Sequence, residues 1–167
     1  MILPTKTSGR DGQEIWLVDG KFLHRNDGPA VINSDGYQAW YQFGMLHRED
    51  GPAISHPDGS KLWYFEDKLH NVGAPAVIRP TGYEEWYQHG KLHREDGPAV
   101  IDPGMMDEWY QFGFLHRFEG PAIIDCNGKN EWRVYGERAF SAGHFQYLTG
   151  CSNETLSYLI LKYGRIG

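Results

Sequence analysis

The sequence has few of the features that mark metal-binding, nucleic-acid-binding and membrane proteins. It has only two cysteines, Cys126 and Cys151, without metal-ligand spacing, so a reduced cytosolic protein is expected, and one disulfide between them is the alternative. Basic residues are outnumbered, with 16 Lys and Arg against 22 Asp and Glu, and the net charge of −6 argues against direct binding to nucleic acid. No run approaches the roughly 18 apolar residues of a membrane span, and the first residues lack the apolar core of a signal peptide. The sequence therefore predicts a soluble, cytoplasmic protein without a transmembrane segment.

Internal repetition is the dominant feature of the chain. The octapeptide LHREDGPA occupies residues 46–53 and again 92–99, and altered copies occupy 23–30, 69–76 and 115–122. The period is 23 residues, with one extra residue in the first repeat. Such a period is typical of repeat proteins, in which one supersecondary unit recurs and the core forms between neighbours.

Each repeat is predicted to form a β-hairpin. Residues 37–43 have the aromatic bias of a strand, Gly44 marks a turn, and a second extended segment runs through the octapeptide to Ile54. An Asp-Gly or equivalent dipeptide closes the repeat. We therefore predict an all-β fold over residues 1–140, a solenoid of serial β-hairpins that form one long, twisted antiparallel meander.

Residues 141–167 are predicted to form a small helical cap. The periodicity changes after Trp132, and Ser141 and Ser152 are candidate N-caps of two helices. We expect the second helix to cover the end of the hairpin array, and a partner-binding helix is the alternative. The apolar residues of the second helix, at i, i+3, i+4 and i+7, are Leu156, Leu159, Ile160 and Tyr163.

Two aromatic columns run through the repeats. Successive side chains of a strand point to opposite faces, so Trp40 and Tyr41 must lie on different sides of the sheet. Tryptophan persists in six repeats, whereas tyrosine is replaced at both ends. This pattern predicts a tryptophan core and a tyrosine binding face, because tyrosine is enriched at interfaces, unless sheet curling half-buries that face. The predicted binding tyrosines are Tyr41, Tyr64, Tyr87 and Tyr110.

Arginine and an acidic residue recur two positions apart in four repeats. The third repeat has Asn71 and Gly73 at these positions, and this joint loss predicts that the two side chains pair. Such a partly exposed salt bridge contributes at most about 1 kcal/mol. A basic row that binds a ligand, Arg48, Arg94 and Arg117, is the alternative hypothesis.

Histidine and glutamate also recur in columns. Equivalent residues of neighbouring repeats are expected roughly 10 Å apart, too far to share a metal ion, so we predict that each histidine bonds a neighbouring turn. A column of glutamates suggests DNA mimicry only weakly, because the same spacing exceeds the distance between successive phosphates along one nucleic-acid strand. The two columns are His24, His47, His70, His93 and His116, and Glu85, Glu108 and Glu131.

We predict no catalytic residue, metal or cofactor.

The hairpin WYxxGxLHRxDGPAxI with its closing Asp-Gly resembles the MORN repeat across residues 12–138. It looks most like the MORN-like arrays with HRxDGPA units of bacteriophages and large DNA viruses. The resemblance implies a non-enzymatic scaffold that binds a protein partner, with a phage protein that engages a host defence protein as the leading hypothesis. A ligand-sequestering trough, a cellular scaffold, a DNA mimic and an enzyme are the alternatives, and self-association is left open.

Overall fold

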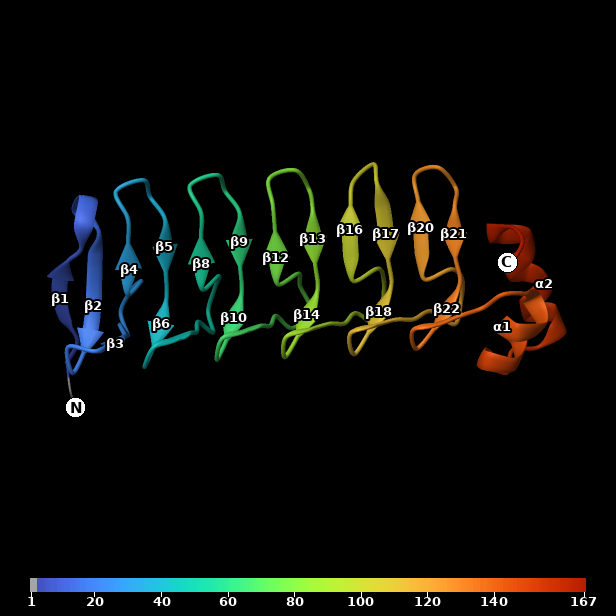
Figure 1. Ribbon diagram of the computed structural model, residues 1–167, viewed down its shortest axis with the longest axis horizontal. Helices are drawn as coiled ribbons and strands as arrows, with labels where there is room; N and C mark the ends of the chain where they lie inside the picture. Colours follow the sequence, from blue (N-terminus) through green and yellow to red (C-terminus); the bar gives the residue numbers. More distant parts are fainter. Residues whose placement is uncertain (1–2) are drawn as a thin grey trace. The chain divides into compact units, whose positions relative to one another are not determined.

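The computed structural model describes residues 3–167, which form short antiparallel strands followed by two helices (Figure 1). The predicted fold class is confirmed, because the strands are serial hairpins of an antiparallel meander and the helices follow them. The described chain divides into two compact units, residues 3–81 with 87–90 and residues 82–86 with 91–167. Neither of the two helices in the described part has the length and apolar character needed to cross a bilayer.

The first compact unit contains a sheet whose neighbouring strands are antiparallel. Val31 pairs with Ile15 on one side and with Ala39 on the other, which shows how each strand joins the next. The strands of this unit are β1 Thr5–Ser8, β2 Glu14–Val18, β3 Phe22–Leu23, β4 Val31–Ile32, β5 Gln38–Ala39, β6 Tyr41–Gln42, β7 Met45–Leu46, β8 Ile54–Ser55, β9 Lys61–Leu62, β10 Tyr64–Phe65, β11 Lys68–Leu69, β12 Val77–Ile78 and β14 Tyr87–Gln88. The sheet has the order β1-β2-β4-β5-β8-β9-β12, and β6-β7 and β10-β11 form separate small hairpins.

The second compact unit repeats this arrangement and adds the helices. Its strands are β13 Glu84–Glu85, β15 Lys91–Leu92, β16 Val100–Asp102, β17 Met106–Glu108, β18 Tyr110–Gln111, β19 Phe114–Leu115, β20 Ile123–Asp125, β21 Asn130–Glu131, β22 Arg133–Val134 and β23 Glu137–Arg138. The sheet order is β13-β16-β17-β20-β21, and β18-β19 and β22-β23 form small hairpins. The helices are α1 Ala142–Thr149 and α2 Asn153–Tyr163.

The predicted strands are interrupted at their tryptophans, except in the first repeat, where β2 runs through Trp16. The segment 37–43, predicted as one strand, is two strands, β5 and β6, separated by Trp40. The backbone N–H of Trp40 donates to the Ala53 carbonyl at 2.8 Å, and the Trp40 carbonyl accepts from the N–H of His47 at 3.1 Å. Each repeat therefore contains two short hairpins that meet at the tryptophan, rather than the single hairpin predicted.

The prediction of a tryptophan core is wrong in the first compact unit. Its buried cluster is Val31, Ala39 and Ile54, against which Tyr41 and other partly buried residues pack. Trp40 is only half-buried and lies outside this cluster. The physical reason is the alternation of side chains, because Ala39 and Tyr41 face the aliphatic cluster while Trp40 faces the other side.

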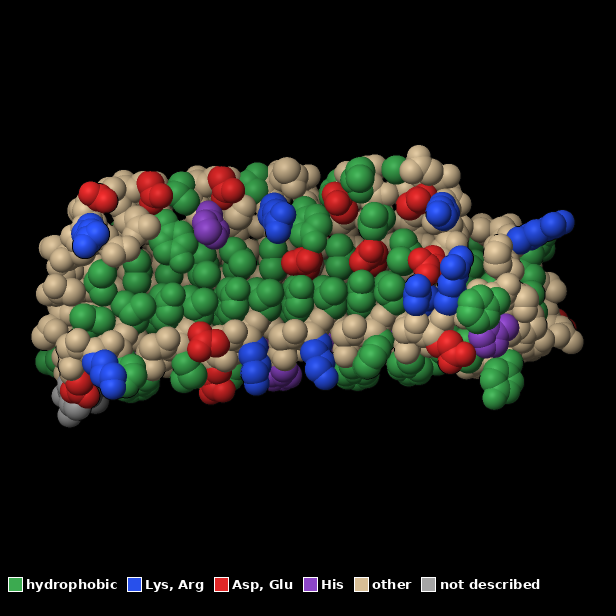
Figure 2. All heavy atoms as spheres, in the orientation of Figure 1, with side chains coloured by type: hydrophobic (Ala, Val, Ile, Leu, Met, Phe, Trp, Pro, Cys, Tyr) green, Lys and Arg blue, Asp and Glu red, His purple; other side chains and the backbone are tan. Residues whose placement is uncertain are grey.

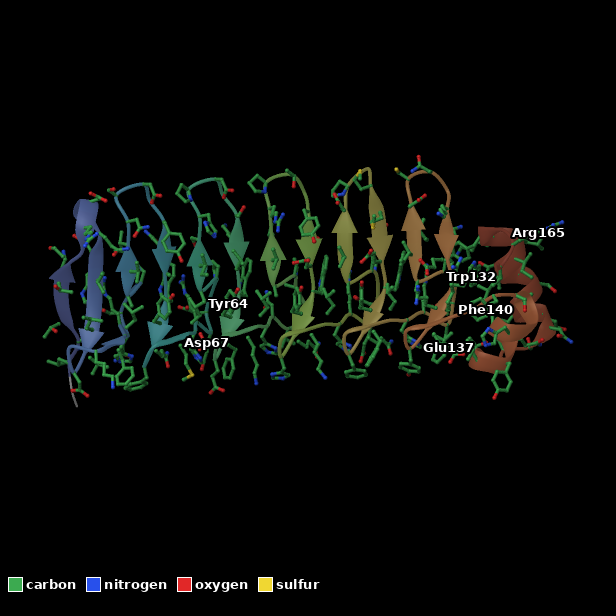
Figure 3. All side chains as sticks on the ribbon, in the orientation of Figure 1. Tyr64, Asp67, Trp132, Glu137, Phe140 and Arg165 are labelled. Carbon is green, nitrogen blue, oxygen red and sulfur yellow. The ribbon has the colours of Figure 1, made fainter. Side chains whose placement is uncertain are left out.

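Trp132 is the exception, because the helices cover it. Its side chain is 2% exposed, and its ring lies edge-on to Phe145 with centroids 4.9 Å apart (Figure 3). The predicted N-caps are confirmed, since the hydroxyl of Ser141 accepts from the N–H of His144 and that of Ser152 accepts from the N–H of Thr155. All four predicted apolar residues of α2 pack in this cluster, Leu156, Leu159, Ile160 and Tyr163. The helices thus cover the last hairpin.

Candidate functional surfaces

The recurring motif HRxDGP folds back on itself around its arginine, and we call it the arginine loop. In the second repeat the guanidinium carbon of Arg48 lies 4.1 Å from the centroid of the Trp40 ring. Its Nε donates to the Asp50 carboxylate at 2.7 Å, and its Nη1 donates to the Pro52 carbonyl at 3.3 Å. A Cβ on Gly51 would stand 2.9 Å from the guanidinium carbon, so an alanine here would force the guanidinium to shift. The motif therefore holds an arginine flat on a tryptophan.

The predicted Arg–Asp pairs are confirmed in three repeats. Arg25 and Arg94 hold Asp27 and Asp96 as Arg48 holds Asp50, with N–O distances of 2.8, 2.8 and 2.7 Å. The hydrogen bond from each arginine lowers the pKa of its aspartate. These arginines stabilise the loops in which they lie. This supports the interpretation of the Arg–Asp pairs as structural over the alternative of a row of arginines that binds a ligand.

Arg117 differs from the prediction. Among the described residues it donates to the Pro121 carbonyl at 3.2 Å and to the Tyr163 hydroxyl at 3.1 Å, and not to Glu119. The reason is that α2 brings Tyr163 against the last arginine loop, where the guanidinium lies 5.3 Å from the tyrosine ring. The helix thus takes the place of the acidic partner.

The third repeat shows the same loop without its arginine. Asn71 replaces the arginine, and its side-chain amide donates to the Pro75 carbonyl at 2.9 Å, as the arginines do in the other repeats. The glycine that gives space to the guanidinium is replaced by Ala74, and the aspartate by Gly73. The three changes fit one another, because without a guanidinium neither the space nor the carboxylate is needed.

The predicted bond between histidine and a neighbouring turn is confirmed in four repeats. The Nδ1 atoms of His24, His70, His93 and His116 accept from the backbone N–H of a turn residue 19 positions later, at 3.1 to 3.3 Å. The imidazole ring also stacks on the ring of that residue, with centroids 3.9 to 4.6 Å apart. Burial lowers the pKa of His70 and of His116. Each of these four histidines therefore joins one repeat to the next, and burial favours the neutral form of His70 and His116.

The turn residues that stack on these histidines have unusual backbone conformations. Phe43, Phe112 and Tyr135 have φ of +49°, +52° and +48°, and each precedes a glycine with positive φ. Two-residue hairpin turns of this kind normally take asparagine, aspartate or glycine, because a bulky side chain is unfavourable at positive φ. This conformation was not predicted, although a residue followed by glycine between two strands is the signal for such a turn.

Aromatic rings gather at these hairpin tips in the second compact unit. Phe112, Phe114, Phe118 and Tyr135 are 58%, 55%, 44% and 54% exposed, and we call them the aromatic tip. The rings of Phe118 and Tyr135 are 6.0 Å apart and both contact His116. Figure 2 shows hydrophobic side chains protruding along this edge, below strands β18 and β22. The patch is aromatic, exposed and built on a buried histidine.

The predicted tyrosines and arginines lie on different surfaces. Tyr41 and Tyr64 are half-buried against the aliphatic cluster, and burial raises the pKa of both hydroxyls (Figure 3 labels Tyr64). Tyr87 and Tyr110 are also half-buried. Arg48 lines a groove that shares no residue with that cluster. The structure therefore does not bring the predicted residues into one site, and the tyrosine binding face stays a prediction.

A groove separates consecutive arginine loops in each compact unit. The first has a volume of about 750 Å³ and lies between loops 25–29 and 47–50, with Trp40 and Gln42 between them. The second has a volume of about 490 Å³ and lies between loops 94–98 and 116–119, with Trp109 and Gln111 in the equivalent places. The two grooves thus repeat one set of chemical groups.

No family model matches the chain, and no curated protein matches it. Within residues 3–167 no group of three or more His, Cys, Asp or Glu side chains is arranged to hold a metal ion. The aromatic tip and the grooves are therefore the candidate functional sites of the described chain.

Proposed function

We propose that this chain is a non-enzymatic repeat scaffold that binds a protein partner, and that the aromatic tip is a contact surface. The observation that carries the proposal is the exposure of Phe112, Phe114, Phe118 and Tyr135 around the β18-β19 and β22-β23 hairpins, with the rings of Phe118 and Tyr135 6.0 Å apart. Exposed aromatic clusters mark interaction surfaces, because their rings lose a large apolar area to a partner at low entropic cost.

Backbone strain supports a role for these rings outside folding. Phe112 and Tyr135 occupy positive φ, where asparagine or glycine would cost less free energy. Unfavourable conformations of this kind are concentrated at functional sites. Stacking on His93 and His116 also fixes the rings, which lowers the entropy lost on binding.

The resemblance to MORN-like arrays supports the same function class. Such arrays are chiefly protein-interaction scaffolds, and the HRxDGPA form is that of bacteriophages and large DNA viruses. This favours a viral context, in which the partner is a host protein such as a defence component.

Capture from a bacterial lysate with Phe112→Asn/Phe114→Ser as the variant tests the proposal. Asparagine tolerates positive φ, so the variant should keep its far-ultraviolet spectrum and melting temperature. Leu161→Ser is the matched control, because Leu161 is 87% exposed on α2. We expect the proteins retained by the native chain to be retained by the control and lost from the tip variant, as quantified by mass spectrometry. Equal capture by all three proteins would contradict the proposal.

The tyrosine face is the second candidate surface, favoured by its partly exposed rings beside the aliphatic cluster. Tyr41→Phe/Tyr64→Phe keeps the packing and removes only the hydroxyls. If this variant loses the captured protein while the tip variant retains it, the tyrosine face is the contact surface.

A further inference from the structure

We infer that the groove between consecutive arginine loops binds an extended peptide segment that carries lysine or arginine. The first groove lies wholly in the first compact unit and shares no residue with the aromatic tip, whereas its counterpart in the second unit shares Phe118 with it.

The mouth of the first groove is acidic, although two arginines line it. The side chains of Arg25 and Arg48 are only 20% and 25% exposed, and each is paired with its own aspartate and stacked on a tryptophan. The carboxylates project into solvent instead, because their side chains are 78% to 84% exposed. These carboxylates belong to Asp27, Glu49 and Asp50. A ligand that approaches the groove therefore meets negative charge first, and a cationic side chain complements it.

The groove also offers groups that match a peptide backbone. Gln42 lines it beside Trp40, and the side-chain amide of Gln42 has no hydrogen-bond partner among the described residues. A primary amide presents one acceptor and two donors, so it can pair with both the N–H and the C=O of an extended chain. The indole of Trp40 adds apolar surface for the peptide. A simple cation would use the carboxylates alone, whereas a peptide uses the glutamine as well.

The second groove repeats both elements. Gln111 takes the place of Gln42, and Glu95 and Asp96 project with side chains 83% and 84% exposed. Phe118 replaces the glutamate of the first groove at the equivalent position. The volumes of both grooves lie within the range of ligand sites in proteins. Each compact unit by itself therefore offers an extended peptide exposed carboxylates and a glutamine amide that is unpaired within the described chain.

Fluorescence anisotropy with a labelled Ala-Lys repeat peptide tests the inference, with the equivalent Ala-Glu peptide as a comparison. We expect the basic peptide to bind and the acidic one not to bind. Glu49→Gln/Glu95→Gln should weaken binding about two- to fivefold, the scale of exposed charge pairs. Gln42→Met/Gln111→Met keeps the side-chain volume and should weaken binding about tenfold, because two hydrogen bonds are lost.

Glu66→Gln/Glu154→Gln is the matched control, since both residues are exposed and lie outside the grooves. It removes the same charge and should leave the affinity unchanged. A loss equal to that of the groove variant would mean that only the net charge of the protein attracts the peptide. An unchanged affinity of the Gln42→Met/Gln111→Met variant would mean that the grooves bind only the cationic group of the peptide and not its backbone. Either result, or no binding of the basic peptide, overturns the inference, and none of these variants alters the aromatic tip.

Discussion

The guanidinium of Arg48 occupies the space that Gly51 leaves by having no Cβ, since a methyl group there would stand 2.9 Å from the guanidinium carbon. The arginine can then lie flat on Trp40. The third repeat has the converse pair, Asn71 with Ala74. The two positions of the loop are therefore coupled, and this coupling can be measured.

Gly51→Ala should destabilise the protein by about 1 to 2 kcal/mol. The added methyl group displaces the guanidinium, which loses the Trp40 ring and a hydrogen bond. In the background of Arg48→Asn, which resembles the third repeat, the same substitution should cost much less. Urea unfolding of the four proteins of this cycle gives the coupling free energy. Equal costs of Gly51→Ala in both backgrounds would show that the two positions are independent.

Stability should fall as the pH is lowered below about 6.5, the ordinary pKa of histidine. Burial lowers the pKa of His116 in the folded state, so the unfolded chain binds more protons at mildly acidic pH and unfolding is favoured there. The stabilising contribution is complete above the unfolded pKa and is lost as the pH falls toward the folded one. Protonation would also remove the Nδ1 acceptor of the Tyr135 N–H.

His116→Phe is the variant that checks this dependence. At pH 7.5 it should be less stable by about 1 kcal/mol, because the Tyr135 N–H loses its acceptor. Between pH 7 and pH 5 its melting temperature should change less steeply than that of the native protein. Parallel curves for the two proteins would rule out His116 as a source of the acid sensitivity.

Leu159→Ala should destabilise the protein by about 2 to 4 kcal/mol, because Leu159 is 3% exposed in the cluster around Trp132 and Phe145. Leu161→Ala, on the exposed face of the same helix, should change the stability by less than about 0.5 kcal/mol. Thermal unfolding compares the two. Similar effects would mean that α2 is held by its helical propensity and not by this contact.

Removal of residues 141–167 should make the remaining chain associate. The truncation uncovers Trp132, which is 2% exposed in the intact chain, together with Arg117 and its loop. Exposed apolar surface beside a strand edge favours aggregation. Light scattering and analytical ultracentrifugation measure the result. A monomeric product with unchanged melting would instead support α2 as a partner-binding helix.

Features that depend on local, repeated residues could be predicted from the sequence. The hairpin fold, the N-caps Ser141 and Ser152, and the Arg–Asp pairs each follow from residues a few positions apart, and comparison between repeats exposed the pairs. The apolar face of α2 was predicted because its period is helical.

The break in each strand could not be predicted, because the alternation of side chains continues through it. Ala39 and Tyr41 face one side and Trp40 the other whether the strand is continuous or interrupted, while the backbone partner changes at Trp40. The tryptophan core was wrong for a related reason. Hydrophobicity indicates that an indole is buried, but it does not show that an arginine from the same repeat covers it.

The aromatic tip was missed because Phe112 and Tyr135 have no preference for positive φ. The stacking of these residues on histidines 19 positions earlier fixes their conformation, and this contact depends on tertiary structure. The signal in the sequence for this conformation is the two-residue turn that ends in glycine between two short strands.

The bond from a turn to the histidine of the preceding repeat, which is found in four repeats, has a consequence for how the chain can change in length. Because one repeat offers the acceptor and the next offers the donor, a duplicated segment of 23 residues brings both halves of a new joint with it. Gene duplication or deletion in whole repeats would therefore conserve joints of this kind. The last repeat is unsuited to such copying, because Ala139 stands in place of its histidine. It therefore offers no acceptor to a following repeat, and the helices come next in the chain.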